Sequence, residues 1–145
     1  MTRPDPSLHI EQQNESVVLR MLAWGEARNQ SAIGIAAVLW VVRNRALKHD
    51  TSLKYEALRP LQFSCFNEGD PNRYKMLNAC DEDPLGWAKV DDVCTLFEAG
   101  HLHDPTLGSL NYYVTKMPTP PAWASAESGW LTRAVIGAHS FGVAA

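Results

Sequence analysis

One glutamate in the sequence has the surroundings that a general acid needs. Glu26 lies in the stretch Ala23-Trp24-Gly25-Glu26-Ala27-Arg28, at the end of an apolar helical pattern. A carboxylate at a helix C-terminus feels the negative end of the helix dipole, and the neighbours Trp24 and Gly25 suggest partial burial. Both effects favour the protonated carboxyl and raise its pKa, as proton donation to a leaving group requires. The competing interpretation is a solvent-facing glutamate that pairs with Arg28.

Three helices are predicted around this glutamate. Apolar residues recur at helical spacing over residues 16–28. Residues 31–48 predict a second helix that is apolar on nearly every side from 33 to 42, as a central, buried helix is. A third helix is predicted over residues 84–99, with Asp83 as its N-cap and proline at its first position.

Short extended segments complete the predicted fold. Strands or strand-like segments are expected at residues 61–66, 110–114 and 136–143, and a loop with three prolines is expected to expose Trp123. The sequence therefore predicts a helix-rich α+β fold with little sheet. A length of 145 residues fits a single domain over residues 1–145, whose first 15 or so residues form an N-terminal extension.

Composition excludes several classes of protein. Thirteen Lys and Arg stand against 16 Asp and Glu, a net charge of −3, whereas nucleic-acid-binding proteins are normally basic. The longest apolar run, residues 32–42, is too short to span a bilayer, so no membrane insertion is expected. The first ten residues contain two prolines and no apolar stretch, so no secretory signal peptide is predicted there.

Three cysteines exclude a full disulfide framework because their number is odd and no C-x-x-C is present. We expect them to be free thiols packed in the core. A single Cys80–Cys94 disulfide is the alternative.

Short motifs in a fixed order resemble the SleB-type cell-wall hydrolases, a family of spore-cortex-lytic enzymes and phage lysins. The opening match is Gly25-Glu26-Ala27-Arg28, followed by an apolar helix that ends in Asn44-Arg45. The later matches follow in the family's order: Gln62-Phe63-Ser64, Asp104-Pro105-Thr106 with Gly108, Tyr112-Tyr113, Trp123, and Ile136-Gly137-x-His139-x-Phe141. Together they cover residues 24–141.

The resemblance implies a lysozyme-like fold, similar to that of lytic transglycosylases, which cuts the glycan strand of peptidoglycan. It implies that Glu26 is the single catalytic residue. A hydrolase would need a second carboxylate roughly 5–9.5 Å away, and Glu68, Asp70 and Asp104 are the candidates. Since none can be placed near Glu26 from the sequence, we favour a lytic transglycosylase over a muramidase.

The resemblance also implies which residues contact the sugar. Gln62, Phe63 and Ser64 are expected on a strand that borders the groove, where the glutamine amide suits N-acetyl and hydroxyl groups. The aromatic residues Tyr112, Tyr113 and Trp123 could stack on sugar rings, with at least one tyrosine in the core because adjacent strand residues face opposite ways. His139 is expected either to orient a site residue or to satisfy a buried hydrogen bond.

Three polar residues of the motifs are expected to be structural. Asp104 is expected to cap its own Asp-Pro-Thr turn. Asn44 and Arg45 are expected to satisfy carbonyls at the end of the central helix. For Gln62 the alternative role is a buried glutamine bonded to backbone.

Two rival functions remain open. His101-x-His103-Asp104, with His139 or Cys65, could form a zinc site for an N-acetylmuramoyl-L-alanine amidase, although H-E-x-x-H is absent. The other rival is a non-catalytic peptidoglycan-binding module with an aromatic groove. The favoured interpretation needs no metal and no cofactor.

The expected context is a phage endolysin, active as a monomer. It would be made in the host cytoplasm without a signal peptide and would reach periplasmic peptidoglycan through a separate holin. A bacterial enzyme whose signal lies outside this sequence is the alternative.

Overall fold

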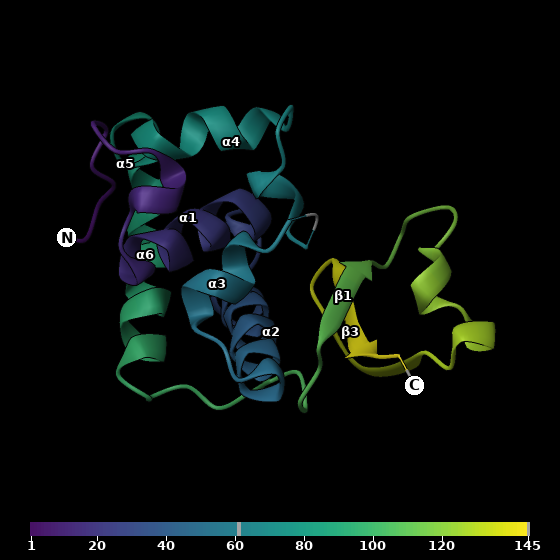
Figure 1. Cartoon of the computed structure of the whole chain (residues 1–145). Helices are drawn as coiled ribbons and strands as arrows, with labels where there is room; N and C mark the ends of the chain where they lie inside the picture. Colours follow the sequence, from purple (N-terminus) through teal and green to yellow (C-terminus); the bar gives the residue numbers. More distant parts are fainter. Residues whose placement is uncertain (61, 145) are drawn as a thin grey trace.

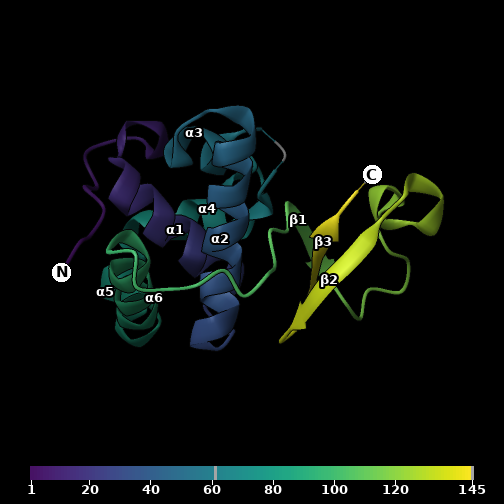
Figure 2. The ribbon, with the colours of Figure 1, turned by 90° about the horizontal axis from the view of Figure 1, so that it is seen from below.

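The computed structural model of the chain describes residues 1–60 and 62–144 and has a mixed α+β fold, as the sequence predicts. The helices are α1 (Glu15–Ala27), α2 (Ala32–His49), α3 (Leu53–Leu58), α4 (Pro71–Lys75), α5 (Ala79–Glu82) and α6 (Pro84–Glu98). The strands are β1 (Asn111–Val114), β2 (Leu131–Ile136) and β3 (His139–Val143). Short 3₁₀ helices are η1 (Ile10–Gln12), η2 (Ser64–Phe66), η3 (Met76–Asn78), η4 (Ala122–Ala124) and η5 (Ala126–Ser128). The helices form one body, and the sheet lies at its side with residues 115–130 outermost (Figures 1 and 2).

The three predicted long helices are confirmed, each with a side-chain cap at its start. The side chain of Asn14 accepts from the Val17 amide at 2.9 Å, which satisfies one of the free N–H groups of α1. Ser31 caps α2, and Asp83 caps α6 ahead of its first-position proline. These helices pack together around residues that are completely buried, including Val18, Leu22, Leu39, Val42 and Val90.

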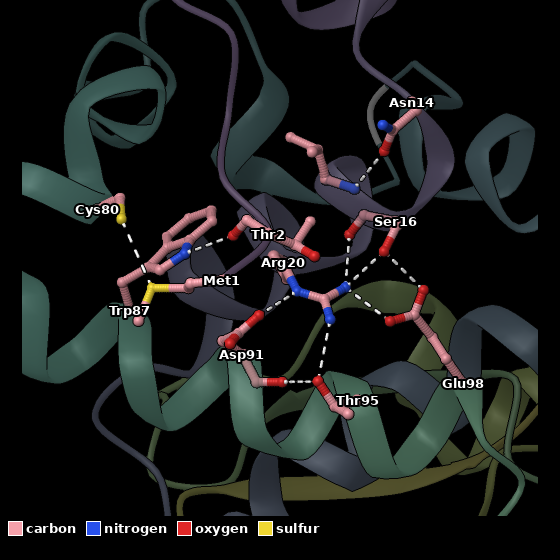
Figure 3. Close-up of polar contacts among 11 residues, drawn as sticks. Met1, Thr2, Asn14, Ser16, Arg20, Cys80, Trp87, Asp91, Thr95 and Glu98 are labelled. Carbon is pink, nitrogen blue, oxygen red and sulfur yellow. Dashed lines mark hydrogen bonds and ion pairs between the residues drawn. The ribbon is translucent and has the colours of Figure 1, made fainter.

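A buried arginine fixes α1 against α6. Arg20 on α1 is only 3% exposed, and its guanidinium donates to Asp91 at 2.6 Å and to Glu98 at 2.7 Å. It also donates to Thr95, so the charge is enclosed by polar groups of one face of α6 (Figure 3). A buried charge is costly unless it is paired and hydrogen-bonded, so these contacts define how the two helices sit against each other.

The N-terminal extension packs on the helices. The indole Nε1 of Trp87 on α6 donates to the Thr2 carbonyl at 3.0 Å (Figure 3). Ile10 is 5% exposed and belongs to the core. The side-chain amide of Gln13 donates to the Asp5 carbonyl at 2.7 Å and its oxygen accepts from the Asp5 amide at 3.0 Å, which closes the loop between them.

The sheet has three antiparallel strands in the order β1-β3-β2. The predicted strand at 110–114 is confirmed as β1. The predicted closing strand over 136–143 is confirmed for residues 139–143, which form β3. Its start is wrong, because Ile136 ends β2 and a turn at 137–138 follows with Gly137 at φ 56°. Strand β2 was not predicted, since most of its side chains are exposed and it lacks a clear apolar alternation. It is held by pairing with β3, whose Phe141 is fully buried.

The predicted strand at 61–66 is also wrong. Leu61 lies outside the described residues, residues 62–63 form a turn, and residues 64–66 are the 3₁₀ helix η2. The backbone bonds here are local: the Phe66 amide donates to the Phe63 carbonyl and the Asn67 amide to the Ser64 carbonyl. The apolar alternation is short and is followed directly by turn-forming residues. The backbone therefore forms hydrogen bonds within the segment and does not pair with a strand.

All three cysteines, Cys65, Cys80 and Cys94, are free thiols, so the Cys80–Cys94 disulfide is ruled out as an interpretation. Within residues 1–60 and 62–144, no helix is long and apolar enough to cross a membrane.

Candidate active site

A cavity of about 440 Å³ lies between the end of α1, the middle of α2, the turn before η2, and the sheet. Segments far apart in the sequence form its wall. All the residues that the sequence analysis assigned to catalysis or sugar contact line it: Glu26, Gln62, Phe63, Ser64, Tyr112, Tyr113, Trp123 and His139. The fold thus brings together the first and last motifs, which are more than a hundred residues apart.

Glu26 is half-buried on the last turn of α1, and burial raises its pKa. The Ser64 hydroxyl lies 3.4 Å from Oε2 of Glu26 and lowers the pKa less than burial raises it, while the negative charge of Asp70 raises the pKa further. The carboxyl therefore keeps its proton to a higher pH than an ordinary glutamate does, as the sequence predicts.

The alternative pairing of Glu26 with Arg28 is not formed. Arg28 donates instead to the Trp24 carbonyl at 3.0 Å and to Asn72 at 3.1 Å. Its guanidinium stacks over the Trp24 ring at 4.0 Å, an arrangement that satisfies the cation without a carboxylate. Trp24 itself is 4% exposed and its Nε1 donates to Asp83 at 2.9 Å, so this tryptophan belongs to the core and not to the groove.

Tyr112 presents its hydroxyl toward Glu26. The ring packs against Phe63, with 6.4 Å between centroids, and against Phe141 on the core side, at 5.3 Å. Burial, followed by the negative charge of Glu26, raises the Tyr112 pKa well above its ordinary value. The hydroxyl forms no well-aligned hydrogen bond within the described chain. It therefore remains a protonated donor, available to the carboxylate of Glu26 or to a ligand in the cavity.

His139 supports the Tyr112 ring from behind. The two ring centroids are 5.0 Å apart in an edge-on arrangement. His139 is 6% exposed, burial lowers its pKa, and its Nδ1 has no hydrogen-bond partner among the described residues. Of the two expected roles, the contact fits orientation of a site residue better than satisfaction of a buried hydrogen bond.

Tyr113 faces away from the core and joins an aromatic cluster at the outer wall. It contacts Trp123 at 6.2 Å and Trp130 at 5.8 Å between ring centroids, and the two tryptophans are 5.4 Å apart. Trp123 is 40% exposed, as the proline-rich loop predicts. Flat, partly exposed rings at the edge of a cavity are suited to sugar stacking.

The turn at residues 62–63 contributes an amide group to the cavity, and the start of η2 contributes a hydroxyl group. Gln62 is exposed to the cavity, and its side-chain oxygen accepts from Nη1 of Arg45, so the interpretation of Gln62 as a buried glutamine bonded to backbone is wrong. Phe63 is 3% exposed and supplies the apolar floor. Ser64 points toward Glu26, as noted above.

Arg45 lines the cavity although the sequence predicts only a structural role for it. It was expected to satisfy carbonyls at the end of the central helix, but it donates through Nε to the Leu110 carbonyl, outside α2, at 2.6 Å. Asn44 likewise reaches Asp104 at 2.9 Å and the Ser109 carbonyl at 3.1 Å. Arg45 stands with Arg43 directly after the apolar run, and this pair of arginines was the available signal. Other lining residues that were not predicted are Val41, Asn67, Asn111, Val114, Met117 and Pro121.

Asp104 caps its own turn, as predicted. It accepts from the Thr106 amide at 2.8 Å and the Gly108 amide at 2.9 Å. Burial alone would raise its pKa, but the hydrogen bonds from Thr106 and Asn44 lower it. Asp104 does not line the cavity, and neither do Glu68 and Asp70, so Glu26 is the single acidic residue among the described lining residues.

The histidines of the zinc interpretation do not assemble a site. Across residues 1–60 and 62–144, no three His, Cys, Asp or Glu side chains are grouped so that they could hold a metal ion.

Comparison with models of known protein families, with curated proteins and with solved structures finds no significant match for this chain. The assignment of the cavity therefore depends on its own geometry and on the sequence motifs.

Proposed function

We propose that the chain is a peptidoglycan glycosidase that cleaves the β-1,4 bond between N-acetylmuramic acid and N-acetylglucosamine, with Glu26 as its catalytic acid and base. The observation that carries the proposal is the half-buried Glu26 carboxyl, whose pKa is raised, on a cavity lined by aromatic and amide side chains. The resemblance to the SleB-type cell-wall hydrolases supports the same residue and a lysozyme-like fold.

The absence of another acidic side chain among the described lining residues favours a lytic transglycosylase over a hydrolase. In this reaction the Glu26 carboxyl gives its proton to the glycosidic oxygen as the bond from that oxygen to C1 of the muramic sugar breaks. The carboxylate then takes the proton of the 6-hydroxyl of the same sugar, whose oxygen bonds to C1. The products are a 1,6-anhydro-muramic end and a free 4-hydroxyl, and no water is consumed.

The other lining residues have supporting roles in this proposal. The Tyr112 hydroxyl can donate to Glu26 once its carboxylate has formed, which stabilises the negative charge between the two proton transfers. The amide nitrogen of Gln62, whose oxygen accepts from Arg45, can donate to the N-acetyl groups of the substrate. Tyr113 and Trp123 suit stacking on a sugar ring at the outer edge. As an endolysin, the protein would act on periplasmic peptidoglycan that it reaches through a holin.

Glu26→Gln tests this proposal, with Glu68→Gln as a matched control because Glu68 is exposed and does not line the cavity. We expect Glu26→Gln to stay folded and still bind cell wall, but to lose lytic activity by roughly 10²-fold or more. Glu68→Gln should lyse like the unmodified protein. Lysis retained by Glu26→Gln would contradict a glutamate mechanism, and binding without any lysis by the unmodified protein would favour the non-catalytic module.

Mass spectrometry of digested peptidoglycan identifies the bond that is cut. Anhydro-muramic ends would support the transglycosylase, and reducing muramic ends would support a muramidase. Free stem peptides would show an amidase and would overturn the proposal.

A further inference from the structure

A second, smaller cavity of about 100 Å³ adjoins the candidate active site. We call it the basic pocket; its described lining residues are Arg45, Lys48, His49, Gln62, Leu110 and Asn111. Arg45, Gln62 and Asn111 also line the active-site cavity, so they form a common wall between the two. Three basic side chains and two amides line the basic pocket, and no described carboxylate does, although the chain as a whole has a net charge of −3.

Arg45 is a buried cation without an anionic partner. It is 8% exposed, its hydrogen bonds go to the neutral Leu110 carbonyl and the neutral Gln62 amide oxygen, and its guanidinium lies 5.5 Å from the Phe63 ring centroid. It forms no ion pair with any described residue, unlike Arg20, the other buried arginine, which has two. Burial lowers the Arg45 pKa, yet a guanidinium stays protonated in proteins. A buried cation that lacks an anion is costly, so this arrangement is suited to an anion that arrives with a ligand.

The carboxylate whose charge acts on Arg45 does not neutralise it, because the charge of Glu56 raises the Arg45 pKa less than burial lowers it. Glu56 is fully buried and accepts from Thr51 at 2.7 Å and from Arg59 at 3.0 Å, while Nδ1 of His49 lies 2.9 Å away. Its charge is thus already matched by Arg59. Lys48 is exposed and has no hydrogen bond or ion pair within the described chain, so its charge is available to a ligand.

The donors of the basic pocket match a carboxylate. A guanidinium and a neighbouring N–H group can each donate to one carboxylate oxygen, and such charge-assisted bonds are stronger than neutral ones. Because the Gln62 oxygen already accepts from Arg45, its amide nitrogen is left as the donor. The basic pocket therefore offers an arginine, an amide N–H and a nearby lysine to one acidic group.

We infer that the basic pocket binds a carboxylate of the stem peptide carried by the muramic sugar, so that the substrate is peptide-bearing glycan and not unsubstituted glycan. This inference rests on the proposed function. The basic pocket adjoins the Glu26 cavity but does not contain Glu26, so the carboxylate that it binds lies at a distance from the bond that is cut. Stem-peptide carboxylates meet this condition, whereas the lactyl carboxylate of a peptide-free strand is held close to the sugar ring by a short ether link at C3.

Calorimetric titration of soluble muropeptides tests the inference, with the Glu26→Gln variant as the background so that no turnover occurs. The probes are a disaccharide-tetrapeptide with free carboxylates, the same compound with carboxamides, and a peptide-free disaccharide that keeps its lactyl carboxylate. We expect the carboxylate form to bind about two- to fivefold more tightly than the carboxamide form, the size of an exposed charge pair. This preference should weaken as salt is raised.

Lys48→Gln should reduce that preference, and Lys75→Gln is the matched control, because Lys75 is also exposed but lines neither cavity. Equal affinity for the carboxylate and carboxamide forms, or an equal loss in both lysine variants, would overturn the inference. A Lys48-dependent preference that the peptide-free disaccharide reproduces would assign the site to the lactyl group and overturn the stem-peptide assignment.

The failures of the two proposals are distinguishable. If the unmodified protein cleaves both peptide forms with the same KM, the proposed glycosidase activity is supported and carboxylate binding by the basic pocket is contradicted. If the protein prefers the carboxylate form but cleaves neither, carboxylate binding by the basic pocket is supported and the glycosidase activity is contradicted.

Discussion

Gly25 and Cys65 approach each other so closely that no side chain fits between them. A Cβ on Gly25 would lie 2.6 Å from the Cβ of Cys65 and 2.8 Å from its sulfur. Cys65 is fully buried in η2, next to Ser64. The absence of a side chain at Gly25 thus lets η2 pack on the end of α1, and this contact brings the Ser64 hydroxyl to the Glu26 carboxyl.

Gly25→Ala should destabilise the protein and separate η2 from α1. Alanine gains about 0.5–1 kcal/mol over glycine in a helix, but overpacking of a core costs about 1–3 kcal/mol. We expect a net loss of stability and a loss of lytic activity larger than stability alone explains, since Ser64 moves away from Glu26. Thermal unfolding followed by circular dichroism, together with lysis at a temperature where the variant is folded, measures both effects.

A second substitution at Cys65 identifies the contact responsible. In the Gly25→Ala background, Cys65→Gly removes both close atoms and should restore stability and activity in part. Cys65→Ala leaves the Cβ that lies 2.6 Å from the new methyl group and should restore less. Equal rescue by the two would show that the sulfur, and not the Cβ, causes the conflict.

Glu26→Gln should raise the thermal stability at neutral pH. Burial raises the folded-state pKa of Glu26, so the native state holds a proton that the unfolded state has already released at the same pH. Stability linked to this group is therefore present below the unfolded pKa of about 4.3 and is lost as pH rises through the folded pKa. Glutamine resembles the protonated form and avoids this loss.

Melting temperatures at pH 7 and pH 4 measure this linkage. The advantage of Glu26→Gln over the unmodified protein should be present at pH 7 and should shrink toward pH 4. Glu68→Gln, an exposed control, should show no such pattern. A Glu26→Gln variant that is less stable at pH 7 would mean that the charged carboxylate is stabilised by its surroundings.

The long helices were predictable because each carries local signals. Asn14, Ser31 and Asp83 are capping residues directly before apolar runs, and all three cap in the structure. Residues 62–66 were wrongly predicted as a strand. The alternation of apolar residues does not show that their backbone forms local hydrogen bonds in place of strand pairing. Strand β2 forms because it pairs with β3, and its sequence has no apolar alternation that would have predicted it.

The candidate site was predictable as a set of motifs but not as a set of contacts. Glu26, Tyr112 and His139 were named from their motifs, and they do meet at one cavity. The role of Arg45 was not predictable, because it depends on which elements lie beyond the central helix: Gln62 on one side and Leu110 on the other. The hydrogen bond from Trp24 to Asp83 was not predictable either, since the two residues are distant in sequence.

Trp130→Ala should weaken glycan binding although Trp130 does not line the cavity. Its ring supports Tyr113 and Trp123, and its Nε1 donates to Thr132 at 2.8 Å, which holds the ring in place. An aromatic pair contributes about 0.5–1.5 kcal/mol, so KM should rise by about two- to tenfold with little change in kcat. Trp130→Phe should recover part of the loss.

Tyr74→Ala is the control for this experiment, because Tyr74 is 68% exposed and lies outside the cavity. It should leave KM unchanged. A fall in kcat without a change in KM for Trp130→Ala would show that the aromatic cluster acts on catalysis and not on substrate binding.

Alkylation of the three cysteines should distinguish Cys80 from the others. Cys65 and Cys94 are fully buried, and Cys80 is partly exposed. Burial raises the pKa of Cys94 to about 12 and also raises the pKa of Cys65, so neither thiol forms a significant amount of the reactive thiolate at pH 8. Iodoacetamide on the native protein should give a single adduct, at Cys80, by peptide mass spectrometry, and three adducts after denaturation. Labelling of Cys65 as fast as Cys80 would mean that η2 opens readily from α1, and the packing against Gly25 that sets the Ser64–Glu26 contact would then not persist in solution.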